Sequence, residues 1–133
     1  KSEDGAAGTI LVLDDPKVIE KKIKRAVTDT ESEVRYDVAA KPGVSNLLSI
    51  LGACTGRTPD QAAEGYTQYG PLKADTAAAV IERLAPIQAR HAELAADPAE
   101  TERILAAGAA KARERATATL ARAREAIGLL APA

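Results

Sequence analysis

Aromatic residues are scarce and methionine is absent in this sequence of 133 residues. There is no phenylalanine, tryptophan or methionine, and the three tyrosines lie at positions 36, 66 and 69. A domain of this size hides roughly two-thirds of the surface that its unfolded chain would expose. Its core must therefore be aliphatic, and the alanine-rich second half favours helices that can approach one another closely.

Cysteine and long apolar runs are also missing. The single cysteine, Cys54, excludes an internal disulfide framework and a cysteine-based metal site, and it fits a reducing compartment. No apolar run approaches the roughly 20 residues of a membrane span, and no charged-then-apolar leader opens the chain. We therefore expect a soluble, cytoplasmic protein without a membrane partner. Because the chain starts at Lys1 and lacks methionine, we also expect it to be a piece of something longer.

Catalytic signatures are absent as well. The sequence has no metal-ligand spacing, no phosphate-binding loop and no dinucleotide fingerprint, so we predict no metal site. His91 could act as a general base, but a packed histidine at the edge of the core is favoured by about five to one. Cys54 is favoured as a small buried apolar residue over a nucleophile by about ten to one. By itself, this chain does not look like a catalyst.

The capping and apolar patterns predict an all-α fold, a bundle of about five helices after a short extended lead-in at residues 9–13. Asp15 and Pro16 are suited to the N-cap and the first position of a helix that runs to about Val27. One face of this helix is apolar, with Ile19, Ile23, Ala26 and Val27.

The stretch KPGVSNLL, residues 41–48, predicts a corner. Pro42 fixes its own φ and Gly43 tolerates almost any φ, so the pair can turn the chain into a new helix. That helix is apolar on most sides and should be the central buried one, ending at Gly56. A capping box of Thr58 and Gln61 then predicts a short helix to about Tyr66, followed by a loop.

Two longer helices complete the prediction. The first runs from about Leu72 to Ala95 with a kink at Pro86, because helical spacing continues across the proline through His91 to Leu94. The second begins at an Asp97 cap and ends near Ile127. We expect its buried stripe to pack tightly on a neighbour; the stripe consists of Leu105, Ala109, Ala112, Ala116, Leu120, Ala123 and Ile127.

Basic side chains gather in two places. One face of the first helix holds Lys17, Lys21, Lys24 and Arg25. The last helix carries Lys111, Arg115 and Arg122 on one flank and Arg113 and Arg124 on the other. Such clusters can meet phosphates, although solvated helix faces are about equally expected from composition. No aromatic residue is interleaved with them, which argues against a stacking platform unless a tyrosine folds next to them.

Several blocks taken together resemble, in order and spacing, the carboxyl-terminal part of bacterial tryptophanyl-tRNA synthetases. They are KSEDGAAGTILVLDDP, KKIKRAVTD, RYDVAAKPGVSNLL, KADTAAAVIERLAPIQAR and GAAKARERA, and they cover essentially the whole chain. Where this sequence has GYTQYGPL, members of the family usually have a longer, glycine-rich stretch.

The resemblance implies roles that the residues alone do not. Lys1 and Ser2 look like the last two residues of the KMSKS signature of class I synthetases, whose lysine helps bind ATP and stabilises the developing pyrophosphate. The parent would use ATP with magnesium. The rest of that signature, the nucleotide-binding fold and the tryptophan pocket are absent, so the fragment alone is expected to be inactive and without a cofactor.

Under this resemblance, residues 1–15 are the remnant of the catalytic loop with its connection, and residues 16–133 form a helical domain of the anticodon-binding type. The implied partners are the tRNA for tryptophan and the catalytic domain of the same chain, in a parent that is a homodimer. Lys17, Lys21, Lys24, Arg25, Lys111, Arg113, Arg115 and Arg122 are then candidates for contact with the tRNA backbone. The alternative is a free-standing helical protein-interaction module without a role in RNA binding.

Overall fold

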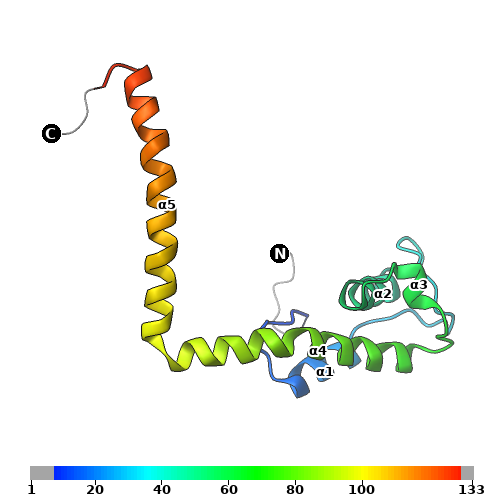
Figure 1. The fold of residues 1–133 in the computed structure, drawn as a ribbon. Helices are drawn as coiled ribbons and strands as arrows, with labels where there is room; N and C mark the ends of the chain where they lie inside the picture. The colour runs from blue at the N-terminus through cyan, green and yellow to red at the C-terminus, as the bar shows by residue number, and fades with distance from the viewer. Residues whose placement is uncertain (1–7, 130–133) are drawn as a thin grey trace. The chain divides into compact units, whose positions relative to one another are not determined.

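The computed structural model describes residues 8–129 and confirms the all-α class. Over that range it contains five helices and no strand: α1 (Pro16–Lys24), α2 (Pro42–Thr55), α3 (Pro59–Ala63), α4 (Tyr69–Ala96) and α5 (Pro98–Ala126) (Figure 1). No helix in this range is both long enough and apolar enough to cross a membrane. The chain divides into two compact units, Lys1–Ala89 (unit 1) and Arg90–Ala133 (unit 2), and each is described by itself.

Helix starts follow the predicted caps. The Asp15 carboxylate accepts a hydrogen bond from the amide of Lys17 at 2.9 Å, and the Asp97 carboxylate accepts one from the amide of Glu100 at 3.1 Å. The capping box between Thr58 and Gln61 is also present. These contacts satisfy amides that have no partner inside the helix, so short polar residues set where the helices begin.

Helix ends differ more from the prediction. α1 stops at Lys24, so Val27 lies outside the helix and is 86% exposed. α3 stops at Ala63 and not near Tyr66, because Gly65 takes a left-handed φ of 86° and turns the chain. The lead-in is not a plain extended run, since the amide of Asp14 donates to the carbonyl of Leu11 at 3.0 Å and closes a turn.

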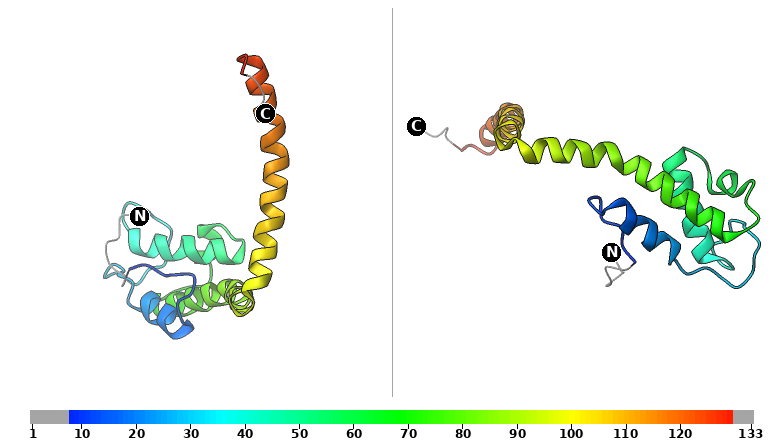
Figure 2. Two further views of the ribbon diagram at one scale, coloured as in Figure 1. Left: turned by 90° about the vertical axis from the view of Figure 1, so that its left-hand side faces the viewer. Right: turned by 90° about the horizontal axis from the view of Figure 1, so that it is seen from below.

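The core of unit 1 is aliphatic, as composition predicts. α2 is its central helix, and Val44 and Leu48 are fully buried. Figures 1 and 2 show α1 beside the first part of α4, and α3 packs on α2. The cluster that these four helices share consists of Ile19, Ile23, Val44, Leu47, Leu48, Leu51, Ala62, Leu72, Ala77 and Val80.

The corner at residues 41–43 requires a glycine. A Cβ on Gly43 would lie 2.2 Å from the carbonyl oxygen of Val27, so the segment after α1 passes directly over the start of α2. Pro42 occupies the first turn of α2, where a missing amide hydrogen leaves no bond unmade. The corner therefore depends on backbone contact as well as on turn chemistry.

Lys41 joins this corner to two other segments. Its side chain is 1% exposed, and its ammonium lies 3.1 Å from Asp29, 2.7 Å from Glu31 and 3.0 Å from the hydroxyl of Tyr69. Burial lowers the pKa of Lys41, but the hydrogen bonds with Glu31, Tyr69 and Asp29 outweigh it, and the net pKa lies above the ordinary value. The ammonium stays charged and holds residues 29–31 against the starts of α2 and α4.

α4 runs through Pro86 as one helix, in agreement with the sequence prediction. The favoured interpretation of His91 as a packed histidine at the edge of the core is wrong. Val80 is buried and Leu84 is half-buried, but Ile87 is 49% exposed and His91 is exposed. Helical spacing determines which residues share a face, but it does not determine how far along that face another element reaches.

The predicted burial of the last helix is also wrong. α5 has no buried residue, and Leu105 and Ile127 in the expected stripe are 67% and 69% exposed. Alanine has the highest helix propensity, so a long alanine-rich segment can be helical without a packing partner. Periodicity here reflects an apolar face that the described residues of unit 2 do not themselves cover.

Candidate functional site

The basic face of α1 is built on a buried apolar face. Ile19 and Ile23 are 0% and 3% exposed and fix the orientation of the helix on the core. The side chains of Lys17, Lys21 and Lys24 are exposed. They are three or four positions apart, so they share the face of the helix that lies opposite Ile19 and Ile23. Arg25, at the C-cap, is exposed too. The structure thus brings together the four cations that the sequence analysis selected on α1.

These cations differ in how they are paired. Lys24 forms an ion pair with Glu20 at 2.6 Å, and its hydrogen bond lowers the pKa of that carboxyl. Both side chains are about half exposed, so water screens the pair. Within residues 8–129, Lys17, Lys21 and Arg25 have no acidic partner within ion-pair distance. This face therefore presents cations that remain available to an anionic ligand.

Lys22 belongs to the same KKIKR run but has another role. Its ammonium lies 2.6 Å from Asp14 and 2.7 Å from the carbonyl oxygen of Thr9, and its side chain is mostly buried. The hydrogen bond from Lys22 lowers the pKa of the Asp14 carboxyl. Lys22 thus holds the lead-in against α1, and the run divides into one structural lysine and an exposed basic face.

The candidates on α5 lie in unit 2. Lys111, Arg113, Arg115 and Arg122 are exposed, and Arg124 is half-buried. In the range that the structure covers, none of these five has a carboxylate within ion-pair distance. Arg103 differs, because it lies 2.8 Å from Glu100 and 3.6 Å from Asp97. α5 is therefore a second exposed basic surface, on a helix that has no buried residue.

The tyrosines are mostly engaged elsewhere. The hydroxyl of Tyr69 lies 2.5 Å from Asp29, and that of Tyr66 lies 2.7 Å from Asp75. Burial raises the pKa of both hydroxyls, and the carboxylates raise it further. Tyr36 is 37% exposed. Two of the three aromatic rings thus have structural contacts with carboxylates, which disfavours a stacking platform.

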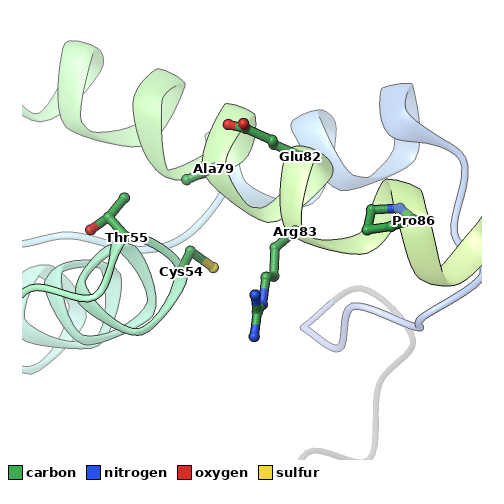
Figure 3. A pocket seen from close by; sticks show the side chains of 6 residues that line it. All are labelled: Cys54, Thr55, Ala79, Glu82, Arg83 and Pro86. Carbon is green, nitrogen blue, oxygen red and sulfur yellow. The ribbon is translucent and has the colours of Figure 1, made fainter.

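Cys54 lies at a shallow groove between α2 and α4. It is half-buried and packs against the core, as expected of a small apolar residue. Cys54 and Thr55 line the groove from α2, and Ala79, Glu82, Arg83 and Pro86 line it from α4 (Figure 3). The hydroxyl of Thr55 donates a hydrogen bond to the carbonyl of Leu51 and accepts one from the side chain of Arg57.

Two further predictions concern ATP and metals. Lys1 and Ser2, the candidates for ATP binding, lie outside the described residues. Among residues 8–129, no group of three or more His, Cys, Asp or Glu side chains is placed to hold a metal ion.

Sequence reasoning missed the polar contacts that hold unit 1 together. Lys41 reads as a surface residue, yet it is buried among Asp29, Glu31 and Tyr69. Gln88 also reads as a surface residue, yet its amide bonds to the lead-in, 74 and 76 residues away. A lysine directly before a proline-started apolar helix is a weak signal for the first contact, and no local signal identifies the second.

Comparison with known proteins places the chain in a family. Residues 1–85 match the family model of tRNA synthetases class I (W and Y). The chain is 49% identical to tryptophan–tRNA ligase 1 of Streptomyces coelicolor over 99% of its length, and 52% identical to tryptophan–tRNA ligase of Leifsonia xyli over 99%. It covers 39% and 40% of those relatives.

A solved structure agrees with this assignment. The crystal structure of tryptophanyl-tRNA synthetase from Mycoplasma pneumoniae superposes with a TM-score of 0.81 and 28% sequence identity, covering 97% of this chain and 40% of that one. The resemblance seen in the sequence blocks is confirmed, and these matches give no support to a free-standing interaction module. The chain belongs to the class I tRNA synthetases of the tryptophan and tyrosine group.

Proposed function

We propose that this chain is the helical, tRNA-binding part of a tryptophan–tRNA ligase. The longer parent attaches tryptophan to its tRNA with the help of ATP. The observation that carries the proposal is the 49% identity to a tryptophan–tRNA ligase across 99% of the chain. Because the chain spans only about two-fifths of its relatives, activation of tryptophan belongs to the parent and not to the chain alone.

The cofactor of the parent is ATP with magnesium. In this proposal Lys1 and Ser2 are the end of a loop that contacts the phosphates, where a lysine ammonium favours the charge that develops on the leaving pyrophosphate. Residues 16–133 form the anticodon-binding type of domain. The remaining partners are the catalytic domain of the same chain and a second copy of the parent, and the enzyme works in the cytoplasm.

The basic face of α1 is the best-supported tRNA contact. Phosphate contacts favour exposed cations that are not already neutralised, and Lys17, Lys21 and Arg25 meet this condition among the described residues. Ile19 and Ile23 fix their direction. Lys24 contributes less because Glu20 already pairs with it. The cations of α5 supply a second set of backbone contacts: Lys111, Arg113, Arg115 and Arg122.

Binding of the tRNA for tryptophan to this chain tests the proposal directly. The double variant Lys17→Ala with Lys21→Ala should weaken binding and reduce the slope of log affinity against log salt by about 0.7 to 0.9 for each lost phosphate contact. Arg103→Ala removes an exposed cation that Glu100 and Asp97 already pair, so it serves as the control and should leave the slope nearly unchanged. Equal effects of the two variants on tRNA binding would contradict a contact between α1 and the tRNA.

The assignment of the parent needs a separate assay. The intact parent should attach tryptophan to tRNA in an ATP-dependent reaction, and this chain alone should not. A parent that charges tRNA with tyrosine, or with neither amino acid, would contradict the proposed substrate even if the fragment binds RNA.

A further inference from the structure

The segment that precedes α1, residues 9–14 (the anchored segment), is held at both ends by Lys22. The ammonium of Lys22 lies 2.6 Å from the carboxylate of Asp14 and donates a hydrogen bond to the carbonyl oxygen of Thr9 at 2.7 Å. The side chains of Lys22 and Asp14 are only 17% and 14% exposed, so water and salt screen this ion pair less than a pair on the open surface. One lysine of α1 thus fixes the chain that leads into its own helix.

Gln88 of α4 holds the anchored segment from a second helix. Its side-chain amide donates to the carbonyl oxygens of Val12 and Asp14, at 2.8 and 3.0 Å. Both acceptors are backbone atoms, so these contacts fix the path of the chain, whichever side chains the segment carries. A glutamine amide nitrogen has two hydrogens to donate, which matches the two carbonyl oxygens that it meets.

Apolar burial contributes little to the position of the anchored segment. Ile10 packs against the core of unit 1, but residues 11–13 are each at least 50% exposed. The free energy gained by removing aliphatic surface from water is therefore small in this segment. Its position depends mainly on the hydrogen bonds of Lys22 and Gln88, which are directional and fix both distance and orientation.

The anchored segment comes shortly after the residues proposed to contact ATP. Thr9 is seven positions after Ser2 in the sequence. A chain of seven residues spans at most about 25 Å, so an anchor at Thr9 limits the volume that Lys1 and Ser2 can reach. A loop with a fixed end also has less conformational freedom to lose when its lysine meets a phosphate, and such preorganisation favours the bound arrangement.

We propose that Lys22 and Gln88 are positioning residues for the activation of tryptophan in the parent. The inference rests on the proposed function, because it requires Lys1 and Ser2 to contact ATP. In this reaction a carboxylate oxygen of tryptophan bonds to the α-phosphorus, the bond from that phosphorus to the bridging oxygen breaks, and its electron pair leaves with pyrophosphate. Lys22 and Gln88 act through the anchored segment, which keeps the lysine of the loop in place while charge develops on pyrophosphate.

Exchange of labelled pyrophosphate into ATP by the intact parent tests this role. Gln88→Ala removes both contacts from α4 and should lower kcat of the tryptophan-dependent exchange by at least about tenfold, because a misplaced group loses its effect in the transition state. The KM for tryptophan should change by less than about twofold, because the lost interaction acts in the transition state and not in binding. Lys22→Met removes the other anchor and should change both constants in the same way.

Tyr66→Phe is the matched control for loss of a side-chain hydrogen bond. It removes the bond of 2.7 Å from the Tyr66 hydroxyl to Asp75, which lies elsewhere in unit 1. Both constants should stay within about twofold of those of the wild-type parent. A loss of kcat in Tyr66→Phe as large as that in Gln88→Ala would show that any weakening of unit 1 slows the reaction, and would overturn the proposal.

Gln88→Glu separates hydrogen bonding from the space that the side chain fills. Ionised glutamate has nearly the shape of glutamine but no hydrogen to donate, and it would face two carbonyl oxygens. The kcat of the exchange should therefore fall at least as much as in Gln88→Ala. A wild-type kcat in Gln88→Glu would show that the hydrogen bonds are not needed and would overturn the proposal.

The later step of the parent reaction distinguishes positioning from general loss of structure. Pyrophosphate has already left when activated tryptophan is transferred to tRNA. In Gln88→Ala the rate of this transfer should therefore stay within about twofold of the wild-type rate, while activation is slowed. Equal losses in the two steps would indicate a merely structural role for Gln88 and would contradict the inference.

Hydrogen exchange in this chain alone gives a readout that needs no ATP. The amide of Asp14 donates to the carbonyl of Leu11 at 3.0 Å, and the amide of Leu11 donates to the Asp14 carboxylate at 2.9 Å, so both amides should be protected. Gln88→Ala should raise the exchange rate of a peptide that contains residues 9–14 by several fold, and Tyr66→Phe should not. Unchanged exchange in Gln88→Ala would show that Gln88 does not fix the segment and would overturn the proposal.

Failure of this inference can be distinguished from failure of the proposed function. If the wild-type parent does not exchange pyrophosphate in the presence of tryptophan, the proposed function fails and the inference fails with it. If the wild-type parent does exchange pyrophosphate and the Gln88 variants match it, only the positioning role is overturned.

Discussion

α2 and α5 are both capped helices that begin with proline in the first turn, but they are stabilised in opposite ways. α2 has 14 residues and buries six of them, whereas α5 has 29 residues and buries none. α2 contains two glycines and two serines, which favour helix poorly, so tertiary packing must hold it. α5 consists largely of alanine, with an Asp97 cap and an ion pair between Arg103 and Glu100, so local interactions hold it. The two regions should respond differently to every perturbation of the core.

Removing a core side chain should give the largest difference. Leu48→Ala empties a fully buried site of α2 and should lower the free energy of unfolding of unit 1 by about 2 to 5 kcal/mol. Leu105→Ala on α5 removes the same atoms from a site that is 67% exposed and should change stability by less than about 0.5 kcal/mol. Tyrosine signals report unit 1 selectively in denaturant titrations, because all three tyrosines lie there. Similar losses in the two variants would contradict the comparison.

A glycine substitution at the corner should have the next largest effect. Gly43→Ala forces a Cβ against the carbonyl of Val27 and should destabilise unit 1 by about 1 to 3 kcal/mol, the usual range for overpacking. Thermal unfolding followed by near-ultraviolet circular dichroism measures the change. If Gly43→Ala stabilised the protein, as alanine normally does within a helix, the close backbone approach would be disproved.

Acid should weaken unit 1 through Asp29. A hydrogen bond from Tyr69, opposed by burial and assisted by Lys41, lowers the pKa of Asp29 below its usual value. A carboxyl with a lowered pKa in the folded state stabilises the fold above its unfolded pKa of about 3.9, and this stability is lost as the pH falls through the folded pKa. The melting temperature of unit 1 should therefore drop below about pH 4. Asp29→Asn should lower it by a few degrees at pH 7 and flatten its dependence on pH.

The smallest expected effect is an increase in stability, whereas the variants above lower it. Gly108 lies in the middle of α5, and a Cβ there would meet no other atom within 4 Å. Gly108→Ala should therefore stabilise α5 by about 0.5 to 1 kcal/mol through helix propensity alone. Far-ultraviolet circular dichroism should show the helical signal of α5 persisting to higher temperature. A loss of helicity would indicate that α5 packs tightly at Gly108.

Local chemistry explains which features could be predicted. The caps at Asp15, Thr58 and Asp97 involve residues two or three positions apart, so the sequence contains both partners of each hydrogen bond. The basic face of α1 was predictable for the same reason. The exposure of α5 and of His91 could not be predicted, because periodicity indicates an apolar face but not whether a second element covers it.

Contacts between distant residues could not be predicted. Lys41 meets Tyr69 across 28 positions, and Gln88 meets the lead-in across more than 70. In the sequence each looks like an ordinary surface residue, since a lysine or a glutamine is usually solvated. Their partners become apparent only when the fold brings the segments together. The contacts of Gln88 also help to hold the turn at residues 11–14 in place.

The burial of Lys41 also has a consequence for the chemistry of its amine. Acylating reagents attack neutral, accessible amines, and the Lys41 ammonium is covered by protein and held in its charged form by two carboxylates and a tyrosine hydroxyl. In the folded chain it should resist acetylation while exposed lysines such as Lys17 and Lys21 are modified. Mass spectrometry of the Lys41 peptide would then give a covalent record of how often unit 1 opens.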